Sequence, residues 1–288
     1  MHITKSKLVI AVLLIFAAVG LLFYFLYSKK VPPQPIPVEV TAPKKEIIGK
    51  SVDGRNIEAY IYGNGDTHLV FVGGIHGGYE WNSVVLAYQM IDYFDANPKI
   101  IPENTSVTII PVLNPDGVFK IVGKEGRFVP ADITQTREQS ALGRFNAHGV
   151  DLNRNFDCKW QPESTWQSKI VSAGTAPFSE PEAITFRDFV FKTKPHVVVF
   201  WHSKAGAVYA SQCGSGIPTT TRDVMNVYAK AGNYPAVDTF DAYAVTGAAE
   251  DWLASLNIPA ITVELKTHDQ TEFDANLTAV KALIETYK

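Results

Sequence analysis

Short apolar runs rich in β-branched residues recur along the chain and predict the strands of a sheet. The first run begins at Thr67 and ends in the glycine-rich string GGIHGG, and the others occupy residues 107–113, 196–201 and 259–265. Long helical or irregular segments separate these runs. Because strands that alternate with helices usually form a parallel or mixed sheet covered by the helices, the pattern predicts an α/β fold.

Two helices are predicted from apolar residues at helical spacing. These residues are Val84, Tyr88, Ile91 and Phe94 after the first strand, and Leu277, Val280 and Ile284 near the end of the chain. Ser179 and Glu182 have the spacing of a capping box and predict a third helix that extends to Phe191. Ligands of such sheets bind at the carboxyl ends of the strands, so polar residues there are the first candidates for a site.

Residues 8–27 form an uninterrupted stretch of twenty uncharged, mostly apolar residues. This is about the length that crosses a bilayer as a helix, so we expect residues 1–30 to comprise a cytoplasmic stub and a transmembrane anchor. The alternative is a cleaved secretory signal with a cleavage site near Gly20. Lysines flank both ends of the stretch, so its charges leave the orientation open.

The segment that follows, residues 31–44, is rich in proline, with five prolines in 31–43. Such a composition favours an extended spacer over a packed element. We therefore expect a folded domain over residues 45–288, held at a distance from the membrane on its extracytoplasmic side.

The composition is that of a globular protein, with 46% hydrophobic and 19% charged residues. A net charge of -3 provides no broad basic field, which argues against nucleic acid as a partner and favours a small molecule or a peptide. The two cysteines, Cys158 and Cys213, would form one disulfide in an oxidising compartment and remain two thiols otherwise. Their sequence positions leave both states open.

A histidine and a carboxylate lie in one loop, and a second histidine ends a distant strand. His76 follows the first predicted strand, Glu80 comes four residues later, and His202 follows the strand over 196–201. Two histidines and one carboxylate would hold zinc with a fourth position free, which is the arrangement of a hydrolytic metal site.

Three other histidines lack such a partner. His148, His196 and His268 lie in loops or at a strand start without a paired carboxylate in the sequence. We expect them to be hydrogen-bonded structural residues.

The nine-residue string GVDLNRNFD, residues 149–157, resembles the signature with which zinc carboxypeptidases of the carboxypeptidase A superfamily bind a substrate carboxylate. Further strings similar to that family are GKSVDGRNI, GGIHGGYE, NPDG, FSEPEA, FWHS and ITVEL. The resemblance covers residues 45–288. It implies a catalytic domain with a central mixed β-sheet, helices on both faces and one Zn²⁺ per chain.

The resemblance gives the loop and strand residues specific roles. His76, Glu80 and His202 match the zinc ligands of the family, and Glu264 in ITVEL matches the glutamate that activates water. A carboxylate inside an apolar strand needs a reason to be there, and its structural alternative is a salt bridge to a lysine or arginine.

Substrate contacts are implied as well. Asn153 and Arg154 match the pair that grips the terminal carboxylate of a peptide, for which a planar guanidinium is well suited. Arg144, in the string GRFN, resembles the arginine that stabilises the oxyanion in the carboxypeptidase D and E branch. Arg127 and Arg137 are weaker candidates for that role.

Two further residues match positions that contact the substrate side chain or close over it. Tyr243 matches a mobile tyrosine, with an ordinary aromatic at the core edge as the alternative. Glu250 lies where the specificity residue is expected, and an acid there would favour lysine, arginine or diaminopimelate. The alternative for Glu250 is a solvated helix residue.

The chain departs from the family in one spacing. The first two ligands are usually separated by two residues, whereas three residues lie between His76 and Glu80. The adjacent glycines of the loop could absorb the extra residue as a bulge.

These features predict a metallocarboxypeptidase that hydrolyses the C-terminal bond of peptides outside the cytoplasm, with cell-wall peptides as one plausible substrate. The partners expected are a peptide with a free C-terminal carboxylate and, through the N-terminal helix, a membrane. The alternatives are a deacylase of small N-acylated amino acids and an inactive peptide-binding module of the same fold.

Overall fold

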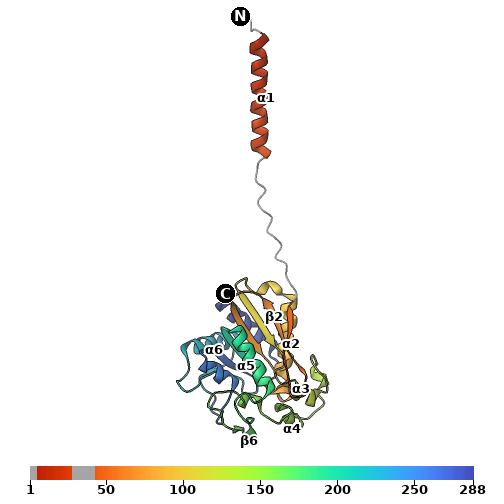
Figure 1. Cartoon of the computed structure of the whole chain (residues 1–288), viewed down its shortest axis with the longest axis vertical. Helices are drawn as coiled ribbons and strands as arrows, with labels where there is room; N and C mark the ends of the chain where they lie inside the picture. Colours follow the sequence, from red (N-terminus) through yellow and green to blue (C-terminus); the bar gives the residue numbers. More distant parts are fainter. Residues whose placement is uncertain (1–4, 28–42) are drawn as a thin grey trace. The chain divides into compact units, whose positions relative to one another are not determined.

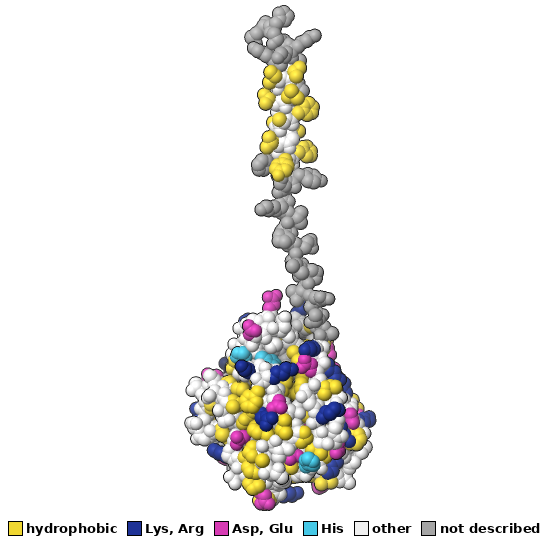
Figure 2. All heavy atoms as spheres, viewed as in Figure 1, with side chains coloured by type: hydrophobic (Ala, Val, Ile, Leu, Met, Phe, Trp, Pro, Cys, Tyr) yellow, Lys and Arg dark blue, Asp and Glu magenta, His cyan; other side chains and the backbone are white. Residues whose placement is uncertain are grey.

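The computed structural model describes residues 5–27 and 43–288 and divides into two compact units, Met1–Val40 and Thr41–Lys288 (Figure 1). In the first unit, α1 covers Lys5–Tyr27, and Figure 2 shows hydrophobic side chains along it. Within the part of the chain that the structure describes, no helix is both long and apolar enough to cross a membrane. The structure therefore does not support the predicted transmembrane anchor. The helix α1 contains the predicted apolar stretch and begins three residues before it, so that it also includes Lys5 and Lys7.

Most of the predicted spacer, residues 31–44, lies outside the described residues. The described part of the second unit begins at residue 43, and its first strand begins at Lys44. The spacer itself remains a prediction.

A mixed eight-stranded sheet forms the centre of the second unit. In sheet order the strands are β1 (Lys44–Lys50), β2 (Asn56–Gly63), β4 (Thr105–Ile110), β3 (Thr67–Val72), β7 (Val197–Ser203), β10 (Ala260–Leu265), β8 (Val208–Ala210) and β9 (Ala236–Val237). The four central strands β4, β3, β7 and β10 are mutually parallel, so their carboxyl ends meet at one edge. The strands predicted from apolar runs are these four.

Alternation along the central strands explains why they read as continuous apolar runs. Leu69 and Phe71 of β3 belong to the core on one face of the sheet, whereas Val70 and Val72 belong to the core on the other. Because successive side chains point to opposite faces, a strand covered on both faces must be apolar throughout. Each such side chain contributes about 1.5–3 kcal/mol relative to an exposed one.

Helices cover both faces, as predicted. The helices of the second unit are α2 (Trp81–Ala96), α3 (Pro115–Val122), α4 (Arg137–Ser140), α5 (Pro181–Thr193), α6 (Thr219–Gly232), α7 (Ala249–Ser255) and α8 (Phe273–Thr286). The first core contains side chains from α2, α6 and α8, and the second contains side chains from α5 and α7. A separate hairpin is formed by β5 (Glu163–Trp166) and β6 (Lys169–Ser172).

The predicted capping box of α5 is wrong in detail. The helix begins at Pro181 after Glu180, and no side chain caps its first turn. The Ser179 hydroxyl instead contacts Asn155 Nδ2 and Glu180 Oε1 at 3.0 and 2.8 Å. Tertiary contacts therefore replace the local cap that the spacing suggested.

Candidate active site

The loop that carries His76 and Glu80 leaves the carboxyl end of β3 and enters α2 through a short 3₁₀ turn, Gly77–Glu80. Gly77 has φ +46°, and a Cβ on it would lie 2.5 Å from the Gly143 carbonyl oxygen. Only glycine fits this position without strain. The turn takes up the extra residue between the two candidate ligands and keeps Glu80 facing His202.

His76, Glu80 and His202 come together at the sheet edge. One potential ligand atom from each lies within 4.8 Å of the others, and all three residues are buried. Glu80 Oε2 is 3.1 Å from His202 Nδ1 and accepts a hydrogen bond from the Ser203 backbone N–H at 3.2 Å. Adjacent parallel strands, β3 and β7, thus bring together two histidines distant in sequence.

The donor set fits a cation. His76 Nδ1 and His202 Nε2 are buried without a hydrogen-bond partner among the described residues. Burial, reinforced by the Arg144 charge, holds the pKa of His76 well below its usual range, so its imidazole is neutral and a lone pair is free. Burial lowers the pKa of His202 too, but Glu80 outweighs it and the net pKa is raised. Two imidazoles and one carboxylate are a typical catalytic zinc set.

Asp151 lies next to these candidate ligands and holds Arg144 beside them. The side chain is fully buried, its Oδ2 accepts from Arg144 Nε at 2.8 Å, and its Oδ1 lies 3.5 Å from His76 Nδ1. Arg144 Nη1 in turn lies 3.6 Å from Glu80 Oε1. The carboxylate orients the guanidinium beside the candidate ligands, and its place in the string GVDLNRNFD was the only sequence signal for it.

Glu264 lies on β10, in register with His202 on the neighbouring strand β7. Its Oε2 accepts from the Ala205 backbone N–H at 3.1 Å. No lysine or arginine within the described ranges forms an ion pair with it, so the salt-bridge alternative has no partner there. Burial and the nearby Glu80 carboxylate raise the pKa of Glu264 to about 7, which suits a group that exchanges protons near neutrality.

Asn153 and Arg154 belong to a short 3₁₀ turn, Leu152–Arg154. Arg154 donates from Nη2 and Nε to the Thr165 carbonyl at 2.9 and 3.3 Å, and from Nη1 to the Asn153 carbonyl at 2.7 Å. Among the described residues, no carboxylate pairs with this guanidinium. Carbonyl groups hold its orientation without neutralising its charge, which leaves it able to bind an anion.

Glu250 and Asp251 make the nearby end of the cavity acidic. Glu250 Oε1 accepts from Asn153 Nδ2 at 3.4 Å, while its buried Oε2 has no partner among the described residues. Burial and the neighbouring Glu250 charge raise the pKa of Asp251 to about 7. The alternative that Glu250 is a solvated helix residue does not match this position.

All nine residues predicted for the site line one cavity of about 880 Å³. They are His76, Glu80, Arg144, Asn153, Arg154, His202, Tyr243, Glu250 and Glu264. Tyr243 lies on the loop before α7, where its ring is half-buried and meets the Phe240 ring at 4.9 Å.

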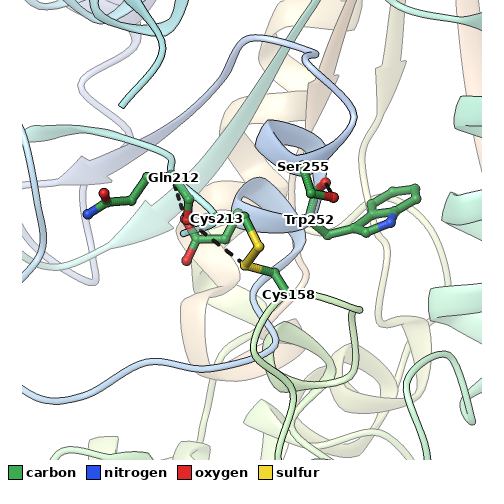
Figure 3. Close-up of a disulfide and its surroundings, with 6 residues drawn as sticks. Cys158, Gln212, Cys213, Trp252 and Ser255 are labelled. Atoms are coloured by element: carbon green, nitrogen blue, oxygen red, sulfur yellow. Dashed lines mark hydrogen bonds between the residues drawn. A yellow bond between two sulfur atoms is a disulfide. The ribbon is translucent and has the colours of Figure 1, made fainter. Parts of the chain in front are cut away.

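The sequence left the state of the cysteines open, and the structure pairs them. Cys158 and Cys213 form a disulfide with their Cα atoms 5.8 Å apart, next to α7 (Figure 3). Closing a loop with a separation of 55 residues stabilises the folded chain by about 4 kcal/mol in the chain-entropy account. Cys158 also lines the cavity, so the bond fixes one of its walls.

The three histidines predicted to be structural are hydrogen-bonded, as expected. His148 Nδ1 lies 2.7 Å from Glu180, and His196 Nδ1 accepts from the His68 backbone N–H at 3.1 Å. His268 also lines the cavity, which its loop position did not reveal.

The two weaker arginine candidates for the oxyanion role differ in their position relative to the cavity. Arg127 forms a surface ion pair with Asp92 at 2.7 Å and does not line the cavity. Arg137 does line it, although its guanidinium is not the one held against Glu80.

Comparisons with known proteins agree with this geometry. The family model described as zinc carboxypeptidase matches residues 41–286. The γ-D-glutamyl-L-diamino acid endopeptidase 1 of Lysinibacillus sphaericus is 24% identical over 239 residues, which are 76% of this chain and 59% of that protein. Carboxypeptidase O of Bos taurus is 25% identical over 234 residues, 74% of this chain and 60% of that protein.

The chain thus spans about three fifths of the length of these two relatives. Among solved structures, murein-tripeptide amidase of Escherichia coli O157 superposes with a TM-score of 0.60 at 22% identity, covering 88% of this chain and 95% of that one. This likeness shows the shared fold. Because the family model covers most of the chain, the protein belongs to the zinc carboxypeptidase family.

Proposed function

We propose that this protein is a zinc-dependent carboxypeptidase that hydrolyses the C-terminal bond of peptides. The observation that carries the proposal is Arg154, a cation without a carboxylate partner among the described residues, in the same cavity as the three candidate metal ligands. An exopeptidase needs such a cation, because it must recognise a free terminal carboxylate beside the scissile amide.

Each residue of the site has a proposed role that follows from its position. His76, Glu80 and His202 would hold Zn²⁺, which supplies Lewis-acid polarisation and activates water. Glu264 takes a proton from the attacking water and returns it to the leaving amine, for which a pKa of about 7 is suitable. Arg144, held by Asp151, stabilises the negative charge that develops on the carbonyl oxygen.

The preferred terminal residue is one with a cationic side chain, such as lysine or diaminopimelate. The unpartnered Glu250 Oε2 offers the complementary charge. Two similar proteins, a γ-D-glutamyl-L-diamino acid endopeptidase and a murein-tripeptide amidase, support a cell-wall peptide as the substrate.

We place the catalytic unit outside the cytoplasm. The Cys158–Cys213 disulfide supports this location, because such bonds persist in oxidising compartments. The apolar stretch over residues 8–27 would direct export, whether it is kept or cleaved. Fractionation of the producing cell tests the proposal, and recovery of the reduced protein in the cytoplasmic fraction would contradict it.

Release of C-terminal residues from a peptide library is the test of the proposed activity. The full chain should release lysine and diaminopimelate in preference to leucine, and Glu250→Gln should reduce that preference by about tenfold, the effect of losing one charge-assisted contact. Cleavage confined to N-acylated single amino acids would identify the deacylase alternative. Peptide binding without turnover would identify the inactive module.

A further inference from the structure

The cavity has a second charged region that the proposed activity does not use. Arg137, Lys169 and Lys204 line it, together with one carboxylate, Glu138. Glu138, Lys169 and Lys204 are all exposed, whereas Arg137 is half-buried, and three positive charges face one negative charge. This region therefore has a net positive charge, in contrast to the acidic end at Glu250.

Arg137 is held in place by residues adjacent to the metal ligands. Its Nη1 donates to the Tyr79 carbonyl at 2.5 Å, and its guanidinium stacks 3.5 Å from the centroid of the Tyr79 ring. Its Nη2 donates to His268 Nε2 at 2.6 Å, and His268 Nδ1 lies 2.8 Å from Ser203 Oγ. Tyr79 precedes the ligand Glu80, and Ser203 follows the ligand His202.

The fixed guanidinium retains free donors. Nη1 is also 3.5 Å from Ser140 Oγ, so the contacts use both Nη1–H bonds and one Nη2–H bond. Among the described residues, the Nε–H and the second Nη2–H have no hydrogen-bond partner, and no carboxylate pairs with the side chain. Adjacent Nε–H and Nη2–H donors match the two oxygens of a carboxylate.

The position of this donor pair defines which part of a substrate it would meet. A peptide whose terminal carboxylate lies at Arg154 has its scissile amide beside the metal ligands. Arg137 contacts Tyr79 and, through His268, Ser203, which are the neighbours of the ligands Glu80 and His202. Glu250 instead contacts Asn153, the neighbour of Arg154. The residue that supplies the acyl group would therefore extend toward Arg137. A carboxylate there would satisfy Arg137 with little loss of side-chain entropy, because the guanidinium is already ordered.

We propose that Arg137 binds a free carboxylate on the residue directly before the released one, so that the substrates are peptides with an acidic residue followed by a cationic one. Lys204 adds a second positive charge on the same side. This inference rests on the proposed function for its orientation. It assigns to Arg137 a specificity role separate from that of Arg144.

Two matched peptides test the proposal, acetyl-Ala-Glu-Lys and acetyl-Ala-Gln-Lys, which differ only in the charge before the terminal lysine. The full chain should cleave the acidic peptide with a kcat/KM about tenfold or more higher, as expected for a hydrogen bond to a charged group. Arg137→Gln should bring this ratio close to unity. Arg127→Gln is the matched control, because Arg127 is a surface arginine outside the cavity, and it should leave the ratio unchanged.

The ratio separates recognition from folding, because any general loss in the variant affects both peptides equally. A ratio near unity in the unaltered protein, or an unchanged ratio in Arg137→Gln, would overturn the inference. Calorimetric binding of both peptides to Glu264→Gln, with and without Arg137→Gln, provides a readout without turnover. If Glu264→Gln binds the acidic peptide more tightly but the unaltered protein does not cleave it, the proposed function is refuted and the role of Arg137 is retained. Equal binding of the two peptides would overturn the role of Arg137.

Discussion

Two groups of residues line the cavity, one held by the central sheet and the other on the helices and loops around it. His202 and Glu264 lie on the central strands β7 and β10, and His76 lies in the buried loop that follows β3. Arg137 and Tyr243 belong to a short helix and a loop at the cavity wall. The sheet therefore positions two of the proposed catalytic and ligand groups, and the surrounding segments determine which peptide reaches them.

The largest expected effect comes from the sheet. Glu264→Gln removes the proposed base while keeping nearly the same shape, so kcat should fall by about 10²–10⁴-fold and bound zinc should remain. Steady-state kinetics with metal analysis checks both. A variant that keeps its kcat would show that Glu264 is not the base. The contrast between the sheet residues and the wall residues would then no longer hold.

Arg154→Gln tests the proposed site for the terminal carboxylate. Loss of the guanidinium should lower kcat/KM for a peptide acid by about 30-fold or more, the effect of truncating one partner of a buried charge pair. The same peptide with a C-terminal amide, which lacks that charge, should be affected far less. Equal losses on both peptides would show that Arg154 has only a structural role.

Gly77→Ala tests whether the lengthened ligand loop depends on its backbone. The new Cβ would approach the Gly143 carbonyl at 2.5 Å in a residue with positive φ. The strain should lower the free energy of unfolding by about 1–3 kcal/mol. Denaturant unfolding measures the change, and Gly123→Ala, with φ +70° and no atom within 4 Å of its Cβ, is the control for positive φ alone.

The last expected effect is on stability at acid pH and concerns His268. Burial and the nearby charge of Arg137 lower the pKa of His268 to about 3 in the folded chain, against about 6.5 when unfolded. The unfolded state binds the proton first, so this contribution to stability is present above pH 6.5 and is lost as the pH falls toward 3. Thermal unfolding between pH 7 and pH 4 should show a smaller decline in His268→Gln, and equal declines would contradict the pKa direction.

The sequence predicted the central part of the fold because apolar runs mark strands that are covered on both faces. Those same runs located His76, His202 and Glu264 at strand ends, and the string around Asn153 supplied the rest of the proposed site. Local patterns failed where tertiary contacts decide, as at the start of α5, where Ser179 contacts Asn155 instead of capping the helix.

The charged region around Arg137 could not be predicted from the sequence, because it too depends on tertiary contacts. Arg137 and His268 are separated by 131 positions and meet only because both approach residues next to the metal ligands. The pairing of Cys158 with Cys213 also depends on the spatial closeness of two segments far apart in the chain. Each of these contacts requires the folded arrangement.

The central claim is that His76, Glu80 and His202 form one zinc site despite the lengthened spacing, and metal content tests it most directly. The full chain, purified without added chelator, should contain about one zinc per molecule, as in other three-ligand catalytic sites. Glu80→Ala should lose most of it while remaining folded by circular dichroism. Full zinc occupancy in Glu80→Ala, or a folded unaltered chain that takes up no zinc, would contradict the account.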